Sequence, residues 1–480
     1  MKYDVIVIGA GLGGLTAGAK LAREGKKVLL LEQHDRPGGC ATTFKRKDYT
    51  MEVGLHEMDG LHPKDIKHRI FDDLGITGKV EFLKVPEFYR FINDRCDLVV
   101  PHDPEEAKAI LKSTFPGEEK GIDDYFYQVL NVRRVMVANR GKPDRSVGEF
   151  LDEIIGNEDL KLVLLGNLGY FHDDPYTLSW LYYLNAQGSY YGGSASFIRG
   201  GSQQLSNALS GIITTYGGTV RLNSLVTSID YDGTLPSGVT YEDTRGKERG
   251  SYSDTAKQIV MNGALPNLAH ELLSKADGLR LSESFAGNNI GVSLLTVYYG
   301  FNKSLKELGS NHYSTFIYDG SVKSPKDILD NNHSDFGTRI FTFVDYSQVD
   351  ARLAPEGKSV GAVCCIDYPS DWIHLDREEY NRMKADVADS FTSRCEKIIP
   401  GFRDAIEHVE VATSLSVKRF TLNPEGAVYG FAQNPGRSFD YLTHLPDNVF
   451  IASAWGKIGG GFSGAIVSGY MTAMDVLRKT

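Results

Sequence analysis

Residues 3–32 follow one uninterrupted pattern of strand, glycine turn, helix and second strand. Residues 3–8 are almost all apolar and rich in Val and Ile, which is typical of a parallel strand buried on both faces. They lead directly into the glycine-rich run at residues 9–14. Small and apolar residues continue a helix as far as Gly25, and residues 28–31 form the next strand. This order predicts a βαβ unit that binds a dinucleotide.

Three glycines and one acid give this unit its chemistry. Gly9 permits the tight turn, Gly11 lets a pyrophosphate approach the backbone, and Gly14 allows the helix to pack closely on the sheet. The free N–H groups at the start of the helix face the phosphates. Glu32 follows the second strand, where a carboxylate accepts both ribose hydroxyls. A dinucleotide is therefore the expected ligand.

The run Arg36-Pro37-Gly38-Gly39 indicates which dinucleotide is bound. It is similar to the Arg-x-Gly-Gly that follows the acidic residue in glutathione-reductase-like flavoproteins. There it brings a cation and backbone N–H groups to the phosphates and ribityl chain, so the resemblance implies FAD. The chain has no second GxGxxG, and no separate domain for NAD(P)H is expected. Cys40 comes next and lies near the cofactor, where packing is favoured over a redox role.

The overall charge excludes one class of partner. The 480 residues carry a formal net charge of −10, whereas nucleic-acid binding rests on basic patches, so no nucleic-acid partner is expected. No run approaches the roughly 20 apolar residues that span a bilayer. A strand that begins at residue 3 leaves no room for a signal peptide. We expect a cytoplasmic protein, with peripheral membrane contact through an apolar patch left open, and the sequence carries no signal for an oligomeric state.

The cysteines and histidines predict no metal site. Five cysteines, an odd number without a CxxC, indicate neither a disulfide framework nor zinc. The twelve histidines contain no HExxH. The run His172-Asp173-Asp174 before Pro175 is interpreted as a solvated turn rather than a metal cluster.

Other elements of the dinucleotide fold lie in distant parts of the chain. A helix after Gly201 with strands over residues 219–231 and 252–262 indicates a second piece, and a strand at 448–452 with a helix over 462–478 indicates a third. The predicted fold is α/β, a Rossmann-like FAD-binding domain of the glutathione-reductase and amine-oxidase type with an inserted α+β substrate domain. The FAD-binding domain is assigned to residues 1–60, 196–266 and 436–480, and the substrate domain to residues 61–195, expected to be mostly helical, and 283–430.

Several separated motifs resemble one family. Residues 51–56, 115–118, 217–229 and 449–465 are similar to segments of the phytoene desaturase, carotenoid isomerase and retinol saturase group of FAD-dependent oxidoreductases. The resemblance implies that Val226 meets the adenine through its backbone and that the C-terminal glycines open a helix toward the pyrophosphate. Cofactor binding is thus assigned to Gly9, Gly11, Leu12, Gly13, Gly14, Glu32, Gln33, Arg36, Gly38, Gly39, Cys40, Val226, Gly459, Gly461, Phe462 and Gly464.

The resemblance also implies a chemistry. Members of this group desaturate, isomerise or saturate C=C bonds in long hydrophobic polyenes. A carotenoid, a retinoid or a related isoprenoid lipid is therefore the expected substrate, with hydride exchange at flavin N5. His56 and Glu57 are the candidates for catalytic proton exchange because they follow the segment that passes the flavin, with Glu425 and Tyr429 as weaker candidates. A purely structural role stays open for all four.

Aromatic residues supply either a tunnel lining or plain core. The clusters are residues 88–91, 180–183, 190–191 and 298–299, and Trp455 in the C-terminal turn has the same two interpretations.

Two further functions stay open. One is an amine-oxidase-like flavoenzyme that oxidises C–N bonds. The other is a non-enzymatic prenyl-lipid carrier like the Rab GDP-dissociation inhibitors, which keep this fold without bound flavin.

Overall fold

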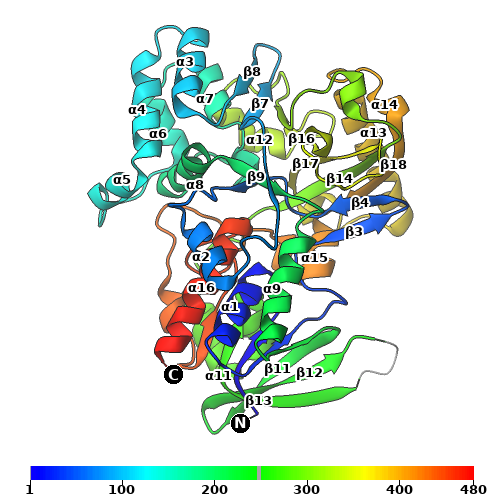
Figure 1. Ribbon diagram of the computed structural model, residues 1–480. Helices are drawn as coiled ribbons and strands as arrows, with labels where there is room; N and C mark the ends of the chain where they lie inside the picture. The colour runs from blue at the N-terminus through cyan, green and yellow to red at the C-terminus, as the bar shows by residue number, and fades with distance from the viewer. Residues whose placement is uncertain (1, 246–249, 480) are drawn as a thin grey trace.

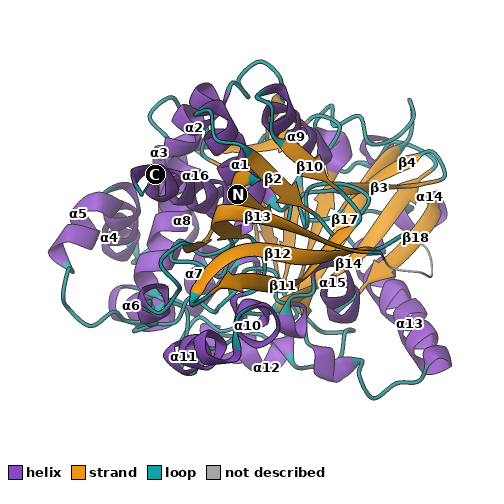
Figure 2. Ribbon diagram, turned by 90° about the horizontal axis from the view of Figure 1, so that it is seen from below, coloured by secondary structure: helices purple, strands orange, loops and turns teal. Residues whose placement is uncertain are grey.

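The computed structural model describes residues 2–245 and 250–479, and two sheets of seven strands each form its framework (Figure 1). Seen from below, the strands occupy the middle of the molecule and helices lie around them (Figure 2). The chain termini lie close to the first sheet, at the bottom of Figure 1.

The first sheet combines strands from three distant parts of the chain. Its parallel strands are β1 (Tyr3–Ile8), β2 (Val28–Leu31), β10 (Thr219–Arg221), β13 (Ser251–Met261) and β19 (Val449–Ile451). The other half of β13 pairs antiparallel with β12 (Leu235–Asp243), which pairs with β11 (Ser224–Asp232). All residues of β2 and nearly all of β1 are buried, which explains their continuous apolar sequence.

Three helices pack together beside this sheet: α1 (Leu12–Arg23), α9 (Gln203–Thr215) and α16 (Gly461–Arg478). A Cβ at Gly13 would lie 1.7 Å from the carbonyl oxygen of Ala452. A Cβ at Gly469 would lie 2.1 Å from the carbonyl oxygen of Gly13. Glycine is required at both positions, because it lets α16 and the turn after β19 reach the start of α1 at backbone distance.

The second sheet has the order β18-β14-β17-β16-β15-β7-β8 and is antiparallel except where β15 meets β7. Helix α13 (Arg377–Glu396) packs on it. Its strands are β7 (Tyr89–Ile92), β8 (Asp97–Val100), β14 (Ser293–Phe301), β15 (Ser314–Ile317), β16 (Phe341–Asp345), β17 (Ser359–Asp367) and β18 (Ile406–Ala412). The prediction that residues 61–195 are mostly helical overlooked the hairpin β7–β8. That hairpin is extended because β15, more than 200 residues later, pairs with it.

Smaller strands and helices complete the fold. No helix in the described part of the chain is both long and apolar enough to cross a bilayer. The strands are β3 (Thr43–Arg46), β4 (Tyr49–Glu52), β5 (Met58–Asp59), β6 (Phe82–Lys84) and β9 (Ala195–Ile198). The helices are α2 (Ile66–Leu74), α3 (Pro104–Thr114), α4 (Glu119–Leu130), α5 (Val132–Ala138), α6 (Val147–Ile154), α7 (Glu158–Leu164), α8 (Trp180–Gly193), α10 (Leu265–Asn267), α11 (Lys275–Phe285), α12 (Ile328–Asn332), α14 (Phe402–Ala405) and α15 (Ser414–Thr421).

Candidate active site

The dinucleotide turn and the Arg-Pro-Gly-Gly loop lie against each other. The N–H group of Gly38 donates to the carbonyl oxygen of Ala10 over 2.7 Å, and Gly11 forms a parallel bridge with Gly38. Gly9, Gly38 and Gly39 have left-handed backbone, with φ of +94°, +135° and +60°. The two segments therefore form one continuous backbone surface, as two adjacent glycine turns require.

Two helices begin near this surface without a side-chain cap. Gly11 precedes α1 and Gly460 precedes α16, and neither start has a capping hydrogen bond from a described side chain. Their first N–H groups are therefore available to an anion. Gly39 and Gly54 are exposed, and residues 461–465 are partly exposed although they belong to a helix packed against α1. These uncapped, accessible starts fit the pyrophosphate and ribityl chain of FAD.

Glu32, Gln33 and Val226 lie at the adenosine end of this arrangement. The Glu32 carboxylate accepts hydrogen bonds from the N–H groups of Ala10 at 2.7 Å and His34 at 2.9 Å. Burial raises the pKa of Glu32, and these N–H groups oppose that shift. Gln33 is partly exposed, and Val226 is buried in β11. The carboxylate is thus held at the tip of β2, where it retains acceptor positions for a ribose.

Four other residues assigned to the cofactor have different surroundings. Arg36 forms an exposed ion pair with Asp35 at 2.9 Å. Leu12 is buried in the first turn of α1, and Phe462 is partly exposed in the first turn of α16. Burial raises the pKa of the Cys40 thiol to about 11, so it stays protonated at neutral pH. A protonated thiol is a poor nucleophile, which agrees with packing as its role.

His56 and Tyr170 form a hydrogen-bonded pair. His56 Nδ1 lies 3.0 Å from the Tyr170 hydroxyl, and the Tyr313 hydroxyl donates to the carbonyl oxygen of His56 over 2.5 Å. Burial lowers the pKa of His56 to about 4, so its imidazole is neutral at pH 7. Burial also raises the pKa of Tyr170 well above its usual value. Sequence reasoning did not identify Tyr170, because it lies in a short 3-10 turn 114 residues after His56.

Glu57 is a buried carboxyl group beside this pair. Neither of its oxygens has a hydrogen-bond partner among the described residues. Burial and the negative charges of Asp59 and Glu87 raise its pKa well above the usual value. Burial at this position therefore favours the protonated form of the carboxyl group. Neighbouring residues whose surroundings shift their pKa values in opposite directions provide a neutral base and a neutral acid at one site.

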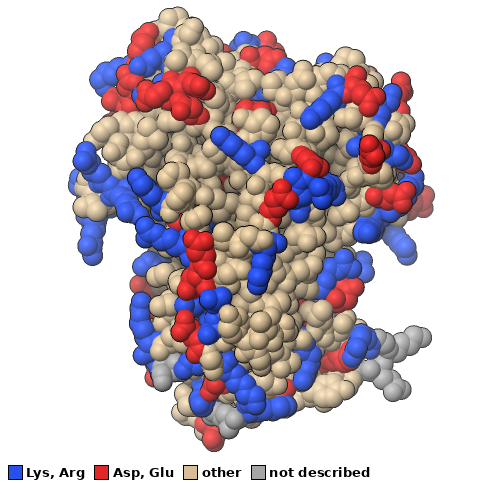
Figure 3. Space-filling view, in the orientation of Figure 1, with Lys and Arg blue, Asp and Glu red and all other residues tan. Residues whose placement is uncertain are grey.

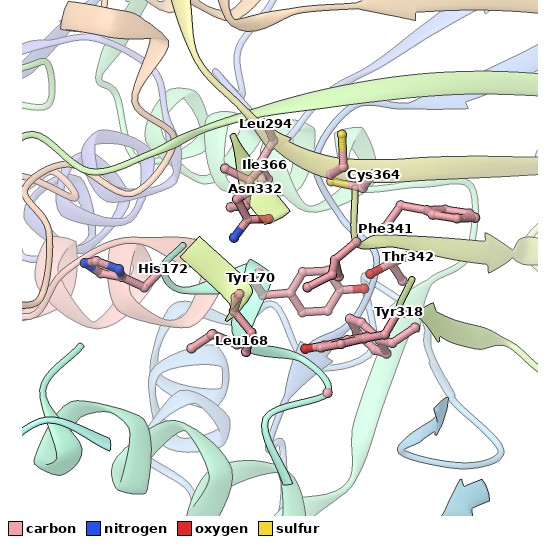
Figure 4. Close-up of a pocket in the computed structure, with 16 residues that line it drawn as sticks. Leu168, Tyr170, His172, Leu294, Tyr318, Asn332, Phe341, Thr342, Cys364 and Ile366 are labelled. Atoms are coloured by element: carbon pink, nitrogen blue, oxygen red, sulfur yellow. The ribbon is translucent and has the colours of Figure 1, made fainter. Parts of the chain in front are cut away.

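A small cavity adjoins the His56–Tyr170 pair, because Tyr170 forms part of its wall (Figure 4). Strands β14, β16 and β17, helix α12 and the turn at residues 168–170 surround it. None of the described lining residues is Asp or Glu. The walls are Gly166, Leu168, Gly169, Tyr170, His172, Leu294, Phe316, Tyr318, Ile328, Asn332, Ile340, Phe341, Thr342, Cys364, Cys365 and Ile366.

Neither of the two weaker catalytic candidates forms a hydrogen bond with His56. Glu425 is exposed in a turn with φ +56°. Tyr429 packs against the start of α16, since a Cβ at Gly460 would lie 2.5 Å from the Tyr429 Cα atom. Trp455 is fully buried, with its ring centroid 4.9 Å from that of Phe431, which supports its interpretation as core.

The aromatic clusters proposed for the lining are core residues. Tyr89 and Tyr183 are fully buried and donate to backbone carbonyl groups over 2.8 Å. Phe316, Tyr318 and Phe341 line the cavity instead, because the second sheet and not α8 forms its wall.

The solvated turn predicted at residues 172–174 is wrong at His172, whereas Asp173 and Asp174 are partly exposed. His172 is 7% exposed, with Nδ1 2.9 Å from Asp173 Oδ1. The Tyr368 hydroxyl donates to Asp173 over 2.6 Å. Tyr368, which follows β17, and Asn332 of α12 both donate hydrogen bonds to Asp173, and local sequence could not indicate these contacts.

Comparison with known proteins identifies the family. Residues 12–477 match the family of flavin-containing amine oxidoreductases. The chain belongs to this family. Two relatives have names that agree with the group that the motifs resemble. An all-trans-retinol 13,14-reductase of Danio rerio is 26% identical over 89% of this chain and 77% of that protein, and a prolycopene isomerase of Daucus carota is 26% identical over 99% and 80%. The predicted resemblance is confirmed.

Solved structures of two amine oxidases share the fold. Putrescine oxidase bound to putrescine has a TM-score of 0.69 at 14% identity and covers 100% of this chain and 99% of its own. Cyclohexylamine oxidase from Brevibacterium oxydans has a TM-score of 0.65 at 16% identity, with the same coverage. The predicted α/β FAD-binding fold and FAD as the cofactor are thereby confirmed, and the protein is an oxidoreductase.

Proposed function

We propose that this FAD-dependent oxidoreductase acts on C=C bonds of a lipophilic polyene. The observation that carries the proposal is the apolar cavity that reaches the His56–Tyr170 pair. The walls of this cavity are mostly apolar with a few polar groups, which is the character of a site for a hydrophobic molecule. Relatives named for a retinol reductase and a prolycopene isomerase, each aligned over most of this chain, support the same substrate class.

The chain's own residues have separate tasks in this proposal. The glycine turn, Glu32 and the start of α16 would hold FAD, and Val226 would meet its adenine. FAD, when bound, accepts or supplies a hydride at a substrate carbon. His56 is the neutral base that removes a proton, and the Tyr170 hydroxyl orients its ring through Nδ1. Glu57, whose protonated form is favoured by burial, is the acid that supplies one in the opposite direction. The apolar walls exclude water from both groups.

The proposal also divides the chain by task. Residues 1–60, 196–266 and 436–480 bind FAD, and residues 61–195 and 283–430 select the substrate. The cavity lies within the second group, since all of its lining residues fall between Gly166 and Ile366.

Anaerobic incubation with a panel of polyenes tests this function. We expect one class of polyene to change the flavin absorbance, with a mass change of two hydrogens in the product of the oxidised or the reduced enzyme. An unchanged mass with a shifted double-bond geometry would identify isomerisation. Peroxide release with amines and no reaction with any polyene would contradict the proposal in favour of C–N oxidation. The cavity walls argue against that outcome, because an ammonium group needs a carboxylate or similar partner in an apolar site.

We also propose that the tip formed by α4 and α5 contacts an anionic membrane surface. Residues 127–142 contain four basic residues and no Asp or Glu, in a chain of net charge −10. Tyr127, Leu130, Met136 and Val137 are exposed large apolar residues here, with Val137 74% exposed. The basic residues Arg133, Arg134, Arg140 and Lys142 are exposed and form no ion pair within residues 2–245 and 250–479.

The tip projects at the left of Figure 1, and blue side chains gather at the same place in Figure 3. Exposed apolar side chains among unpaired cations match a bilayer interface, where anionic headgroups meet acyl chains. A lipophilic substrate would be available at that surface.

Charge reversal at Arg133 and Arg134 tests the contact. We expect the unmodified protein to sediment with vesicles that contain phosphatidylglycerol, and the Arg133→Glu/Arg134→Glu variant to bind about tenfold or more weakly because each cation contributes about 1 kcal/mol. The Arg377→Glu/Arg382→Glu variant on α13 is the matched control, with unchanged binding expected. Equal binding of both variants, or no preference for anionic over neutral vesicles, would contradict the contact.

A further inference from the structure

Glu57 lies at the inner end of a row of side chains that leads toward solvent. Neither of its oxygens forms a hydrogen bond within the described residues. The N–H group of Tyr313 donates to Glu87 Oε1 over 2.7 Å, and the Tyr313 hydroxyl donates to the carbonyl oxygen of His56 over 2.5 Å. Glu87 and the peptide group between His56 and Glu57 therefore lie at the two ends of one buried tyrosine. Burial is the main cause of the raised pKa of Glu57, and the charge of Glu87 adds to it.

The other side of Glu87 faces a histidine that solvent can reach. The Glu87 side chain is 11% exposed, and His312 Nδ1 lies 3.6 Å from Glu87 Oε1. The His312 side chain is 29% exposed, and it lines a small cavity together with Arg90 and Ser310. Histidine takes up and releases a proton near neutral pH. Glu87 thus stands between a group that exchanges protons with water and the buried carboxyl group of Glu57.

Asp59 is the second carboxylate whose charge acts on Glu57, and its partners hold it ionised. Lys67 Nζ lies 3.2 Å from Asp59 Oδ2, and the Ser463 hydroxyl donates to Asp59 Oδ1. Burial raises the pKa of Asp59, but Lys67 and these hydrogen bonds outweigh it, so the pKa is lowered overall. By contrast, Glu87 forms no ion pair with any described lysine or arginine. It is therefore the carboxylate near Glu57 that is free to take up and release a proton.

We propose that Glu87 relays protons from His312 to Glu57. When Glu57 has given its proton to a substrate carbon, the Glu57 carboxylate takes a proton from the carboxyl group of Glu87. The Glu87 carboxylate then takes one from Nδ1–H of protonated His312, and neutral His312 is protonated again by water. One solvent proton thus enters for each proton delivered. The inference rests on the proposed function for the use of this proton, whereas the route itself can be measured without a substrate.

Infrared spectroscopy tests the route without turnover. The C=O stretch of a protonated carboxyl group shifts when deuterium replaces its hydrogen, and the band of Glu57 is the one that Glu57→Gln removes. After rapid mixing of the flavin-loaded protein with D₂O, we expect this shift to be about tenfold or more slower in Glu87→Gln, because a positioned acid–base group speeds proton transfer by about 10² to 10⁴-fold. Glutamine keeps an acceptor for the N–H group of Tyr313, so the fold is retained.

Two further variants complete the infrared test. Glu87→Asp keeps a carboxyl group and is expected to exchange faster than Glu87→Gln. Glu307→Gln makes the same change at an exposed glutamate and is expected to exchange like the unmodified protein. Equal exchange in Glu87→Gln and the unmodified protein, or the absence of any band that depends on Glu57, would overturn the relay.

A kinetic test separates the relay from the proposed function. With reduced enzyme in excess over a reactive polyene, Glu57 already holds its proton, so Glu87→Gln should react as fast as the unmodified protein. Repeated turnover requires Glu57 to be protonated again, and the variant should then be about tenfold or more slower. An equal loss in both measurements would overturn the relay. No reaction of the unmodified protein with any polyene would overturn the proposed function, and the infrared exchange would still decide the relay.

Discussion

Replacing Gly11 by valine is expected to give a folded, colourless and inactive protein. Gly11 has φ −68°, a conformation that valine adopts, so the backbone of the turn can persist. A Cβ there would lie 2.8 Å from Asn262 Nδ2, the end of a side chain that can move. The valine methyl groups would instead occupy the space beside the exposed Gly39, where the pyrophosphate must approach the backbone.

Flavin absorbance per protein, together with the melting temperature, measures this effect. We expect affinity for FAD to fall by far more than tenfold, which is 1.4 kcal/mol. The melting temperature should match that of flavin-free unmodified protein, because the variant loses only the stability supplied by the ligand. Gly211→Ala is the matched control, since a Cβ at this exposed position in α9 meets no atom within 4 Å. Full flavin content in Gly11→Val would show that the site is misassigned.

The contrast with Gly13 separates binding from folding. A Cβ at Gly13 would clash with the backbone oxygen of Ala452 at 1.7 Å. Gly13→Ala should therefore destabilise the packing of α1 on the turn after β19. Loss of flavin there would not report on the cofactor contact.

Removing the His56 imidazole is expected to lower kcat by about 10² to 10⁴-fold while flavin stays bound, because a positioned base contributes that much. His56→Gln tests this by stopped-flow absorbance of the flavin. Tyr170→Phe keeps the ring that forms an edge contact with Phe316 and removes only the hydroxyl. We expect a smaller loss there, about tenfold, since the base remains and only its orientation is freed. Unchanged kcat in both variants would exclude the pair from proton exchange.

The pH profile provides an independent check of the same base. Because burial lowers the pKa of His56 to about 4, the rate that depends on it should stay level as the pH falls through 6.5 and decline only toward pH 4. An exposed histidine would lose activity near pH 6.5. The contribution of His56 to the free energy of unfolding also decreases as the pH falls. The unfolded state binds the extra proton first, so the contribution of His56 is full above pH 6.5 and is lost between pH 6.5 and 4.

The Glu57→Gln variant separates the proposed proton donor, Glu57, from the proposed proton acceptor, His56. Glutamine has the same shape as the protonated carboxyl group and is also neutral, so Glu57→Gln should fold normally. It cannot supply the proton that the protonated acid provides. Reduction of a C=C bond should slow, while proton removal by His56 continues. If the rates of C=C reduction and of the reverse oxidation fell to the same extent, Glu57 would have a packing role instead.

Local sequence patterns were sufficient to predict the cofactor-binding half of the site. Strand β1, the glycine turn and β2 lie where residues 3–32 predicted, because a buried parallel strand, a turn without Cβ atoms and a helix start each leave a signature within a few residues. The C-terminal helix begins at Gly461, within one residue of the prediction. Cys40 and Trp455 were each considered as site or core residues, and Trp455 is fully buried while Cys40 is partly buried.

The substrate-binding half of the site depends on contacts between residues far apart in the sequence, which local sequence patterns cannot predict. Tyr170, Asn332 and Cys364 meet around one cavity although they are widely separated along the chain. The burial of His172 and the pairing of β7 with β15 likewise depend on residues far away in sequence.

The sequence by itself determined the fold class, FAD as the cofactor and the family, because glycine turns and strand periodicity act over short range. It also named His56 and Glu57. Only the tertiary structure decided the direction of their pKa shifts, since burial lowers the pKa of His56 and raises that of Glu57. It alone brought Tyr170 to His56 and to the wall of an apolar cavity. Substrate choice depends on such long-range packing, in which each wall residue comes from a different element.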